Sequence, residues 1–299
     1  GIQDFTLGSL VSNLIINQTY QVDIPSGFIV DGNETSYVGT AWTFTTADAS
    51  YKLYAWGEGS NGSGLNNRTT YSSPTQIPGT NWGTFTGSDG STHGVNLLIT
   101  KSDGTLWGWG NNEYGQNALA RTPGYSSPVQ LGSNTNWSAY SSSYYTTMAV
   151  NTSGELWVRG YNNYGQLGQN YTPSRSSPVQ LPGTTWSSLI AGKEMMLATK
   201  TDGTLWGWGA NGNGQLAQNS TAANSYSSPV QIPGTSWSSA IAGGRMTAHA
   251  VKTDGTLWAW GDNNYGQLGQ NESNPARRSS PVQIPGTDWK KMSDSPGSN

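Results

Sequence analysis

A short tryptophan-glycine segment returns five times along this chain, and this repetition constrains the fold more than any other feature. Its clearest copies are Thr105–Gly110, Thr204–Gly209 and Thr256–Gly261, which read Thr-Leu-Trp-x-Trp-Gly. Two looser copies are Lys52–Gly57 and Glu155–Gly160. The closing glycines of successive copies are 53, 50, 49 and 52 residues apart. Such a period, in a chain of short alternating apolar segments, predicts a repeat array.

Each repeat contains four strand-like parts. In one copy, Met195–Lys200 leads through an Asp202-Gly203 turn into the Leu-Trp-x-Trp-Gly strand. Asp-Gly between two alternating segments predicts a hairpin, because glycine adopts positive φ at low cost. A glycine-bearing loop follows, then a Ser-Ser-Pro-Val-Gln strand (Ser227–Ile232) and a short strand that begins at Trp237. Four strands per repeat of this length are typical of a β-propeller blade.

The linked segments Asp-Gly-Thr-Leu-Trp-Gly-Trp-Gly, Gly-Gln-Leu-Gly and Ser-Ser-Pro-Val-Gln-Ile resemble the repeat of the regulator of chromosome condensation family over residues 36–292. The resemblance implies a propeller, usually of seven blades. This chain departs from that number, because it has five Trp-Gly hairpin strands, five Ser-Pro strands and five strands opened by Trp. We therefore expect an all-β fold, a β-propeller of four-stranded blades. Five blades are expected; six or seven would require residues 1–35 or missing sequence.

The two ends of the chain suggest how the ring closes. The last strand expected, Trp289–Met292, has no hairpin after it, and Thr40–Thr46 leads into the first hairpin strand without a Trp-led partner. Pairing of these N- and C-terminal strands would complete the fifth blade and remove the sheet edges. Three regions follow: an N-terminal extended arm or small β-element at 1–35, the repeat propeller at 36–292, and a flexible C-terminal tail at 293–299.

Composition excludes several classes of function. A net charge of −3 and the lack of a basic run longer than two residues argue against nucleic acid as a partner. The sequence has no apolar run long enough to insert into a membrane. It also lacks cysteine, which excludes disulfides, thiolate metal sites and cysteine nucleophiles. We expect no cofactor.

The residues that commonly carry chemistry belong to the repeat or stand alone. Thirteen of the 14 tryptophans occupy repeat positions, so packing within and between blades explains them better than a binding surface. His93 and His249 lie in different repeats, which predicts structural hydrogen bonding and no metal site. No Gly-x-Ser-x-Gly elbow occurs in a strand-to-helix context. We predict no catalytic residues and no enzymatic activity.

The loops before each Ser-Ser-Pro strand differ in every copy and are the candidate binding surface. They contain Arg and Tyr, the residue types enriched at binding hot spots, on what should be one face of the ring. Solvated connectors are the alternative explanation. The candidates are Arg68, Tyr71, Arg121, Tyr125, Tyr171, Arg175, Tyr226, Arg277 and Arg278.

Arg159 is a separate candidate, because it replaces the second tryptophan of the hairpin strand in the third copy. A charge in this position either binds a ligand or pairs with a carboxylate. The acidic residues that come next before and after Arg159 in the sequence are Glu155 and Glu194. We expect one of them to pair with Arg159.

These observations favour a non-enzymatic module for recognition or assembly. The absence of cysteine, the low charge, the arm and the lack of an initiator Met suggest a surface component of a phage or other extracellular assembly. The arm would contact other chains of the assembly, and the loops would bind a protein or surface glycan at the extracellular or virion surface. One alternative is a soluble secreted protein-binding inhibitor or adhesin. Another, implied by the resemblance, is an exchange-factor-like partner of a small GTPase.

Overall fold

The computed structural model describes residues 19–22, 42–45, 51–57, 59, 63–87, 96–117, 124–221, 224–271 and 277–292. The chain divides into two compact units, Gly1–Tyr51 and Lys52–Asn299. The predicted tail at 293–299 and most of the predicted arm at 1–35 lie outside the described residues. The described residues include no helix with the length and hydropathy needed to cross a membrane.

The described part of the first unit is a two-stranded antiparallel sheet. Strand β1 (Thr19–Val22) pairs with β2 (Trp42–Thr45), with Thr19 opposite Thr45. Strand β2 coincides with the segment that we expected to complete the first blade. In the described residues β2 pairs with an N-terminal strand and Trp289–Met292 forms no strand, so the expected pairing of these two segments is not formed there.

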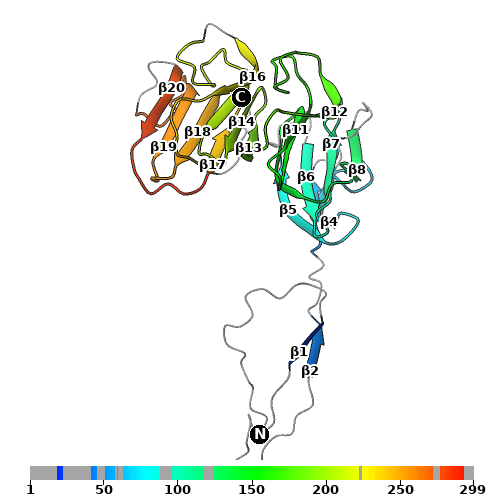
Figure 1. The fold of residues 1–299 in the computed structure, drawn as a ribbon. Coiled ribbons are helices and arrows are strands. Elements are labelled where there is room, and N and C mark those ends of the chain that lie inside the picture. Colours follow the sequence, from blue (N-terminus) through cyan, green and yellow to red (C-terminus); the bar gives the residue numbers. More distant parts are fainter. Residues whose placement is uncertain are drawn as a thin grey trace, which may run out of the picture. The chain divides into compact units, whose positions relative to one another are not determined.

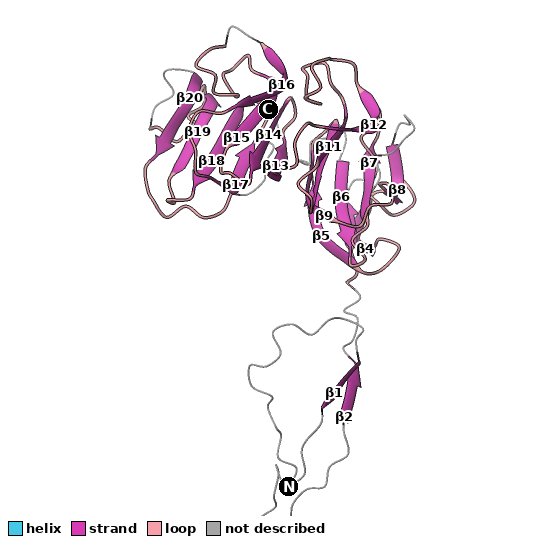
Figure 2. Ribbon diagram, viewed as in Figure 1, coloured by secondary structure: helices cyan, strands magenta, loops and turns pink. Residues whose placement is uncertain are grey.

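The second unit is built from five antiparallel sheets in chain order (Figures 1 and 2). Blade 1 contains β3 (Tyr54–Gly57) and β4 (Tyr71–Gln76). Blade 2 contains β5 (Trp82–Gly87), β6 (Asn96–Lys101), β7 (Leu106–Asn111) and β8 (Gly124–Gln130). Blade 3 contains β9 (Trp137–Ser142), β10 (Thr146–Asn151), β11 (Leu156–Gly160) and β12 (Arg175–Gln180). Blade 4 contains β13 (Trp186–Ala191), β14 (Met195–Lys200), β15 (Leu205–Ala210) and β16 (Ser225–Gln231). Blade 5 contains β17 (Trp237–Gly243), β18 (Thr247–Lys252), β19 (Leu257–Asp262) and β20 (Arg277–Ile284).

This arrangement confirms the predicted all-β propeller of four-stranded blades. In each complete blade the strands pair in sequence order. The first strand of a blade contacts the first two strands of the blade before it: β9 contacts β5 and β6, β13 contacts β9 and β10, and β17 contacts β13 and β14. The Trp-led strand is therefore the one that packs blade against blade, and the Ser-Ser-Pro strand lies at the opposite edge of the sheet.

Polar residues of the repeat fold the turns and loops. In the hairpin turn of blade 4, the Asp202 carboxylate accepts hydrogen bonds from the backbone N–H (2.9 Å) and the hydroxyl (2.6 Å) of Thr204. In the loop after β11, the side-chain oxygen of Asn162 accepts from the Leu167 N–H at 2.8 Å. The Gln166 side-chain oxygen accepts from the Tyr164 N–H at 2.9 Å. Side chains thus replace the missing ladder partners of the loop backbone.

The loops of blades 1, 3 and 4 also fasten their blades to the next one. Asn170 adopts a left-handed conformation (φ 60°), and its N–H donates to the Ser227 carbonyl in blade 4 at 2.7 Å. Gly165 has φ +80°, and a Cβ there would collide with the backbone of Ser227. Glycine is therefore required twice over, for the conformation and for the close approach. Blade 4 fastens to blade 5 in the same way, from Asn219 to the Ser279 carbonyl.

Tryptophan fills the junctions between blades, as predicted. Trp208 of blade 4 and Trp260 of blade 5 are fully buried, and their indole N–H groups donate to Gln166 O (2.6 Å) and Gln215 O (2.8 Å) of the preceding blade. The two ends of the array differ. Trp56 of blade 1 is 64% exposed and Trp289 is 40% exposed. In the described residues no strand is formed at 287–292, so these two repeat tryptophans lack the packing partner that the others have.

Candidate functional site

The predicted binding residues share a structural position in the blades. Five of them lie at the start of the outer strand of a blade. Each is paired in register with the closing glycine of the neighbouring hairpin strand. The pairs are Tyr71 with Gly57, Tyr125 with Gly110, Arg175 with Gly160, Tyr226 with Gly209 and Arg278 with Gly261. Repeat symmetry therefore places these residues equivalently in successive blades.

The tyrosines and arginines in these positions do different things. Tyr71 and Tyr125 are half-buried against the core between blades 1 and 2, and Tyr226 packs against the core between blades 4 and 5. Their rings anchor the loops to the blades. Arg68 and Arg175 are exposed, as is Arg277, while Arg278 is partly buried. The exposed arginines are the part of this set that is available to a partner. Arg121 lies outside the described residues.

Two contacts hold these arginines in place. The Arg175 guanidinium lies 5.1 Å from the centre of the Tyr171 ring, so this predicted pair does come together. The Arg277 Nη1 donates to the Gly212 carbonyl of blade 4 at 2.9 Å. Arg68 lies in blade 1, so the exposed arginines are distributed over three blades and do not converge on one pocket.

Arg159 occupies an unusual position at the junction of blades 2 and 3. It lies on β11 opposite Thr147, whereas the matching pairs in blades 4 and 5 are Trp208 with Met196 and Trp260 with Ala248. The side chain is 6% exposed, and burial lowers the pKa of its guanidinium to about 10. At neutral pH the group is therefore still a buried cation.

The expected pairing of Arg159 with Glu155 or Glu194 is wrong. Glu155 accepts a hydrogen bond from the Asn151 side chain at 2.7 Å, and Glu194 forms an ion pair with Arg245 at 3.0 Å. Within the described part of the chain, the Arg159 side chain forms no hydrogen bond and no ion pair. A buried charge without a partner is costly, so this position is the least expected one in the molecule on packing grounds.

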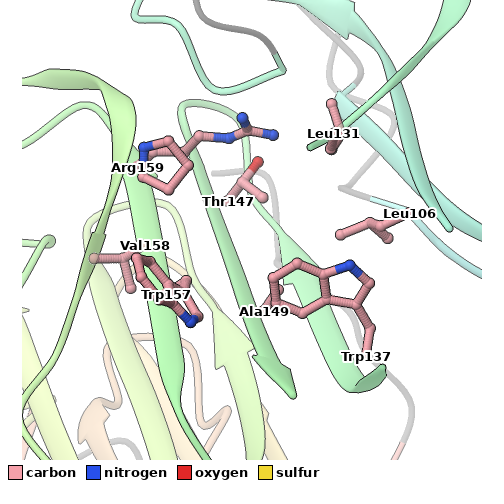
Figure 3. Close-up of a pocket in the computed structure, with 9 residues that line it drawn as sticks. Leu106, Leu131, Trp137, Thr147, Ala149, Trp157, Val158 and Arg159 are labelled. Atoms are coloured by element: carbon pink, nitrogen blue, oxygen red, sulfur yellow. The ribbon is translucent and has the colours of Figure 1, made fainter. Parts of the chain in front are cut away.

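The Arg159 guanidinium lines a cavity that the replaced tryptophan would otherwise fill. The cavity has a volume of about 40 Å³, and it adjoins a groove of about 560 Å³ that shares Leu131, Trp137, Trp157 and Pro178 with it. Figure 3 shows the guanidinium reaching over Thr147 toward Leu131. Tyr125 from the predicted set lines the groove as well.

A cluster of tyrosines near the same junction was missed by the sequence reasoning. Tyr145 packs edge-on against Tyr114 and Tyr144, with ring centres 5.0 and 4.2 Å apart, and Tyr161 completes the contact set at 4.8 Å from Tyr114. Burial raises the pKa of the Tyr145 phenol. The Tyr-Tyr pair at 144–145 was the available signal, since the matching turn in blade 4 has Lys193 and Glu194.

Neither histidine forms part of a metal site in the described residues. His249 is largely buried, which lowers the pKa of its imidazole, and a hydrogen bond with the Gln267 backbone opposes that shift. His93 lies outside the described residues. Across the residues that the structure describes, no three His, Asp or Glu side chains are grouped so that they could hold a metal ion.

Family models identify the repeats. The model of the regulator of chromosome condensation (RCC1) repeat matches residues 153–194, 202–251 and 254–294. A second model of the same repeat matches residues 96–116 and 240–267. Together they cover just over half of the chain. The search of curated proteins finds no match.

Solved structures agree with this assignment. The chain is similar to yeast RCC1 (Prp20) bound to Kap60, with a TM-score of 0.65 and 18% identity, over 79% of this chain and 58% of that one. Prp20p from Saccharomyces cerevisiae matches with a TM-score of 0.66 and 18% identity, over 79% of this chain and 59% of its own. Human WBSCR16 matches with a TM-score of 0.63 and 18% identity, over 81% and 69%. The chain thus spans less than three fifths of the length of the yeast structures.

These comparisons contradict the interpretation of the chain as a phage or extracellular surface component, and the extracellular or virion location with it. The matching repeats are those of RCC1, and the yeast structures are described by their binding to Kap60, Gsp1p and histones. That interpretation depended on amino-acid composition, the N-terminal arm and the lack of an initiator Met, and no motif for a location supported it. The repeat matches, the blade architecture and the solved structures together show that this chain belongs to the regulator of chromosome condensation (RCC1) repeat family.

Proposed function

We propose that this chain is a non-enzymatic protein-binding propeller whose partner is a small GTPase, which it engages in the manner of an exchange factor. The observation that carries the proposal is the set of exposed arginines, Arg68, Arg175 and Arg277, on the loops of three blades. The similarity to Prp20p, a protein described by its binding to Gsp1p and histones, supports the partner class.

The construction of the loops suits recognition of a large partner. The loops of Arg68 and Arg175 are fixed to the following blade by backbone hydrogen bonds, from Asn66 to Ser126 and from Asn170 to Ser227, and the half-buried Tyr71 anchors the first of them. The Arg277 side chain is held by its hydrogen bond to the Gly212 carbonyl. A partner therefore meets preformed side chains and little ordering entropy is lost on binding. The arginines are spread over separate blades, which favours an extended protein surface over a small ligand.

The test is a nucleotide-release assay with the full chain and a purified small GTPase loaded with a fluorescent GDP analogue. We expect the chain to accelerate release in a saturable manner. Replacement of Arg68, Arg175 and Arg277 together by Ala should raise the half-saturating concentration of the chain at least about tenfold, because arginine is a frequent hot-spot residue. Lys290→Ala with Lys291→Ala, a change of two exposed residues outside these loops, is the matched control and should have no effect.

Two outcomes would revise the proposal. Binding of the GTPase without faster release would retain the protein-binding role and remove the exchange activity. Failure to bind any GTPase, in a preparation that remains folded by circular dichroism, would contradict the assigned partner class.

A further inference from the structure

We propose that the cavity at Arg159 is a binding site for a carboxylate, presented by a peptide segment that carries an apolar side chain beside the acid. The first line of evidence is that Arg159 does none of the structural work of the residue it replaces. In blades 4 and 5, the indole N–H of Trp208 and Trp260 satisfies a glutamine carbonyl of the preceding blade. In blade 3, the Thr147 hydroxyl donates to the equivalent Gln116 carbonyl at 2.8 Å.

Because Thr147 supplies the hydrogen bond to the Gln116 carbonyl, the Arg159 guanidinium is not needed for that contact. The residue opposite the tryptophan is Met196 in blade 4 and Ala248 in blade 5, and neither side chain can donate a hydrogen bond. Blade 3 therefore differs from blades 4 and 5 at two facing positions, with Arg159 in place of Trp and Thr147 in place of Met or Ala. The Gln116 carbonyl keeps a hydrogen-bond donor, while the Arg159 side chain remains unpaired within the described residues. Random loss of a tryptophan would not be expected to supply the compensating hydroxyl.

A second line of evidence is that the cavity contains no acidic side chain that could pair with Arg159. The junction also differs at Trp157, whose buried indole nitrogen has no hydrogen-bond partner in the described structure. In the other hairpins the matching indole donates to a threonine, as Trp206 does to Thr204 at 2.8 Å. Blade 3 has Glu155 at that position, and its carboxylate is used by Asn151. None of the residues that line the cavity or the groove is Asp or Glu.

Blade 3 lacks the lysine that the other three complete blades of this chain have, and its absence opens the groove further. In blade 4, the Lys200 ammonium lies over the rings of Trp186 and Trp206, at 4.7 and 4.2 Å from their centres, and Trp186 packs against Trp206. The equivalent of Lys200 in blade 3 is Asn151, which turns to Glu155. Trp137 is consequently only half-buried, whereas Trp186 is 3% exposed.

These features define the ligand class. A buried guanidinium binds carboxylate in a planar, two-point geometry, and it does so strongly where water is excluded. The cavity of about 40 Å³ has room for a group of carboxylate size, and the adjoining groove of about 560 Å³ has apolar walls from Leu131, Trp137 and Pro178. Such walls favour an acid with an apolar body over a bare anion. The single cation and the net charge of −3 disfavour a polyanion.

The test uses phenylacetate as the probe, with phenylacetamide as its neutral isostere, so it requires neither the GTPase nor the exposed loop arginines. Binding to the full chain is followed by tryptophan fluorescence at constant ionic strength. We expect saturable binding of phenylacetate, at least tenfold weaker binding of phenylacetamide, and at least tenfold weaker phenylacetate binding by Arg159→Gln. Lys291→Gln, which removes an exposed positive charge from a residue that lines neither the cavity nor the groove, is the control and should bind like the unaltered chain.

Equal binding of the acid and the amide, or undiminished binding by a folded Arg159→Gln variant, would overturn the proposal. A measurement on the unaltered chain covers the case in which that variant fails to fold. Titration of the ¹⁵N-labelled chain with phenylacetate should shift the indole N–H signal of Trp157 and leave that of the distant Trp260 unchanged. No shift of the Trp157 signal at millimolar probe would also overturn the proposal.

Discussion

The junction between blades 3 and 4 and the junction between blades 2 and 3 use the same backbone in opposite ways. At the first, eleven buried hydrophobic residues form one cluster that includes Trp186 and Trp208. At the second, only four buried hydrophobic residues cluster, and no tryptophan is among them. Asn117 stands where the loops of blades 3, 4 and 5 have a fully buried leucine such as Leu167. The second junction thus replaces apolar packing by polar contacts and a cavity.

The polar junction is ordered, however. The Asn96 side chain of blade 2 donates to the Ser143 carbonyl of blade 3 at 3.2 Å, and the Ser142 hydroxyl donates to the Asn96 carbonyl at 2.8 Å. Hydrogen bonds across blades are therefore rebuilt wherever apolar contacts are lost. A residue that departs from the repeat, such as Arg159, is therefore informative when the residues around it compensate for the lost packing. Such compensation preserves the fold around a residue that packing alone would not select.

The largest expected effect comes from removing the tryptophan of the apolar junction. Trp208→Ala should lower the free energy of unfolding by about 3–5 kcal/mol, because it opens a large cavity and leaves the Gln166 carbonyl without its donor. Arg159→Ala, the matched change at the polar junction, should cost less than about 1 kcal/mol, since it also removes an unpaired buried charge. Urea unfolding followed by tryptophan fluorescence measures both. Equal losses would show that the two junctions are energetically alike.

Two glycines, Gly165 and Gly266, test how much the contact between a loop and the next blade contributes to stability. Gly165 and Gly266 hold the same loop position with φ +80° and +74°, yet a Cβ at Gly165 would strike Ser227, whereas a Cβ at Gly266 would meet nothing within 4 Å. Gly266→Ala should cost about 1–2 kcal/mol for the left-handed conformation alone. Gly165→Ala should cost about 1–2 kcal/mol more, because the backbone of the next blade has to move. Thermal unfolding of the two variants decides this, and similar melting temperatures would argue against the docking contribution.

The polar junction should become more stable when it is converted into the apolar one. Thr147→Ala with Arg159→Trp copies the Ala248 and Trp260 pair of blade 5. The indole would fill the cavity and donate to Gln116, so we expect a gain of about 1–3 kcal/mol in the free energy of unfolding. Thr147→Ala alone should instead cost about 1 kcal/mol through the lost hydrogen bond to Gln116. A double variant that is less stable than the unaltered chain would mean that the junction backbone cannot accept the tryptophan.

The smallest expected effect distinguishes the hairpin turns by pH. Side-chain and backbone hydrogen bonds from Thr105, Thr204 and Thr256 hold the pKa of Asp103, Asp202 and Asp254 below the usual 3.8. Because the folded pKa is depressed, the stabilisation is complete above pH 3.8 and is lost as the pH falls through the lower folded value. Blade 3 uses Asn151 to bind the Glu155 N–H at 3.0 Å, and an amide does not titrate.

Hydrogen exchange across this pH range tests the difference. Protection of the amides of residues 105, 204 and 256 should decline as the carboxylates are protonated, after correction for the intrinsic exchange rate. Protection of the Glu155 amide should stay constant over the same range. Parallel losses at all four amides would mean that the aspartates do not control these turns.

Sequence periodicity was sufficient to predict most of the propeller. The alternation in the Leu-Trp-x-Trp-Gly segments and the Asp-Gly or Ser-Gly turns are local signals, and in blades 2 to 5 a hairpin forms at the predicted place. The partner of Trp42–Thr45 was not predictable in this way, because a four-residue strand carries little register information and β1 has no repeat motif. The interpretation of Trp56 and Trp289 as packed residues was wrong for a related reason, since burial of a terminal repeat depends on a neighbour that the repeat itself does not encode.

The candidate site was only partly visible in the sequence. Tyr71, Tyr125 and Tyr226 share their alignment with Arg175 and Arg278, yet the rings point into the blade cores, which depends on packing across blades. Arg159 stood out as a charge in a tryptophan position, but its lack of a carboxylate partner did not. Glu155 and Glu194 are committed to Asn151 and Arg245, and such competition among neighbours becomes apparent only in three dimensions.

Each complete blade is made from consecutive strands, and in blades 3 and 4 the loop that follows the third strand carries the asparagine that fastens the blade to the next one. A duplicated gene segment of one repeat length would therefore bring its own four strands and its own half of one attachment. The array can lengthen or shorten by whole units without rearranging the rest, which gives a genetic reason for blade numbers to differ among relatives of one repeat family. A copy that diverges, as blade 3 has done, then alters one junction while its siblings continue to hold the molecule together.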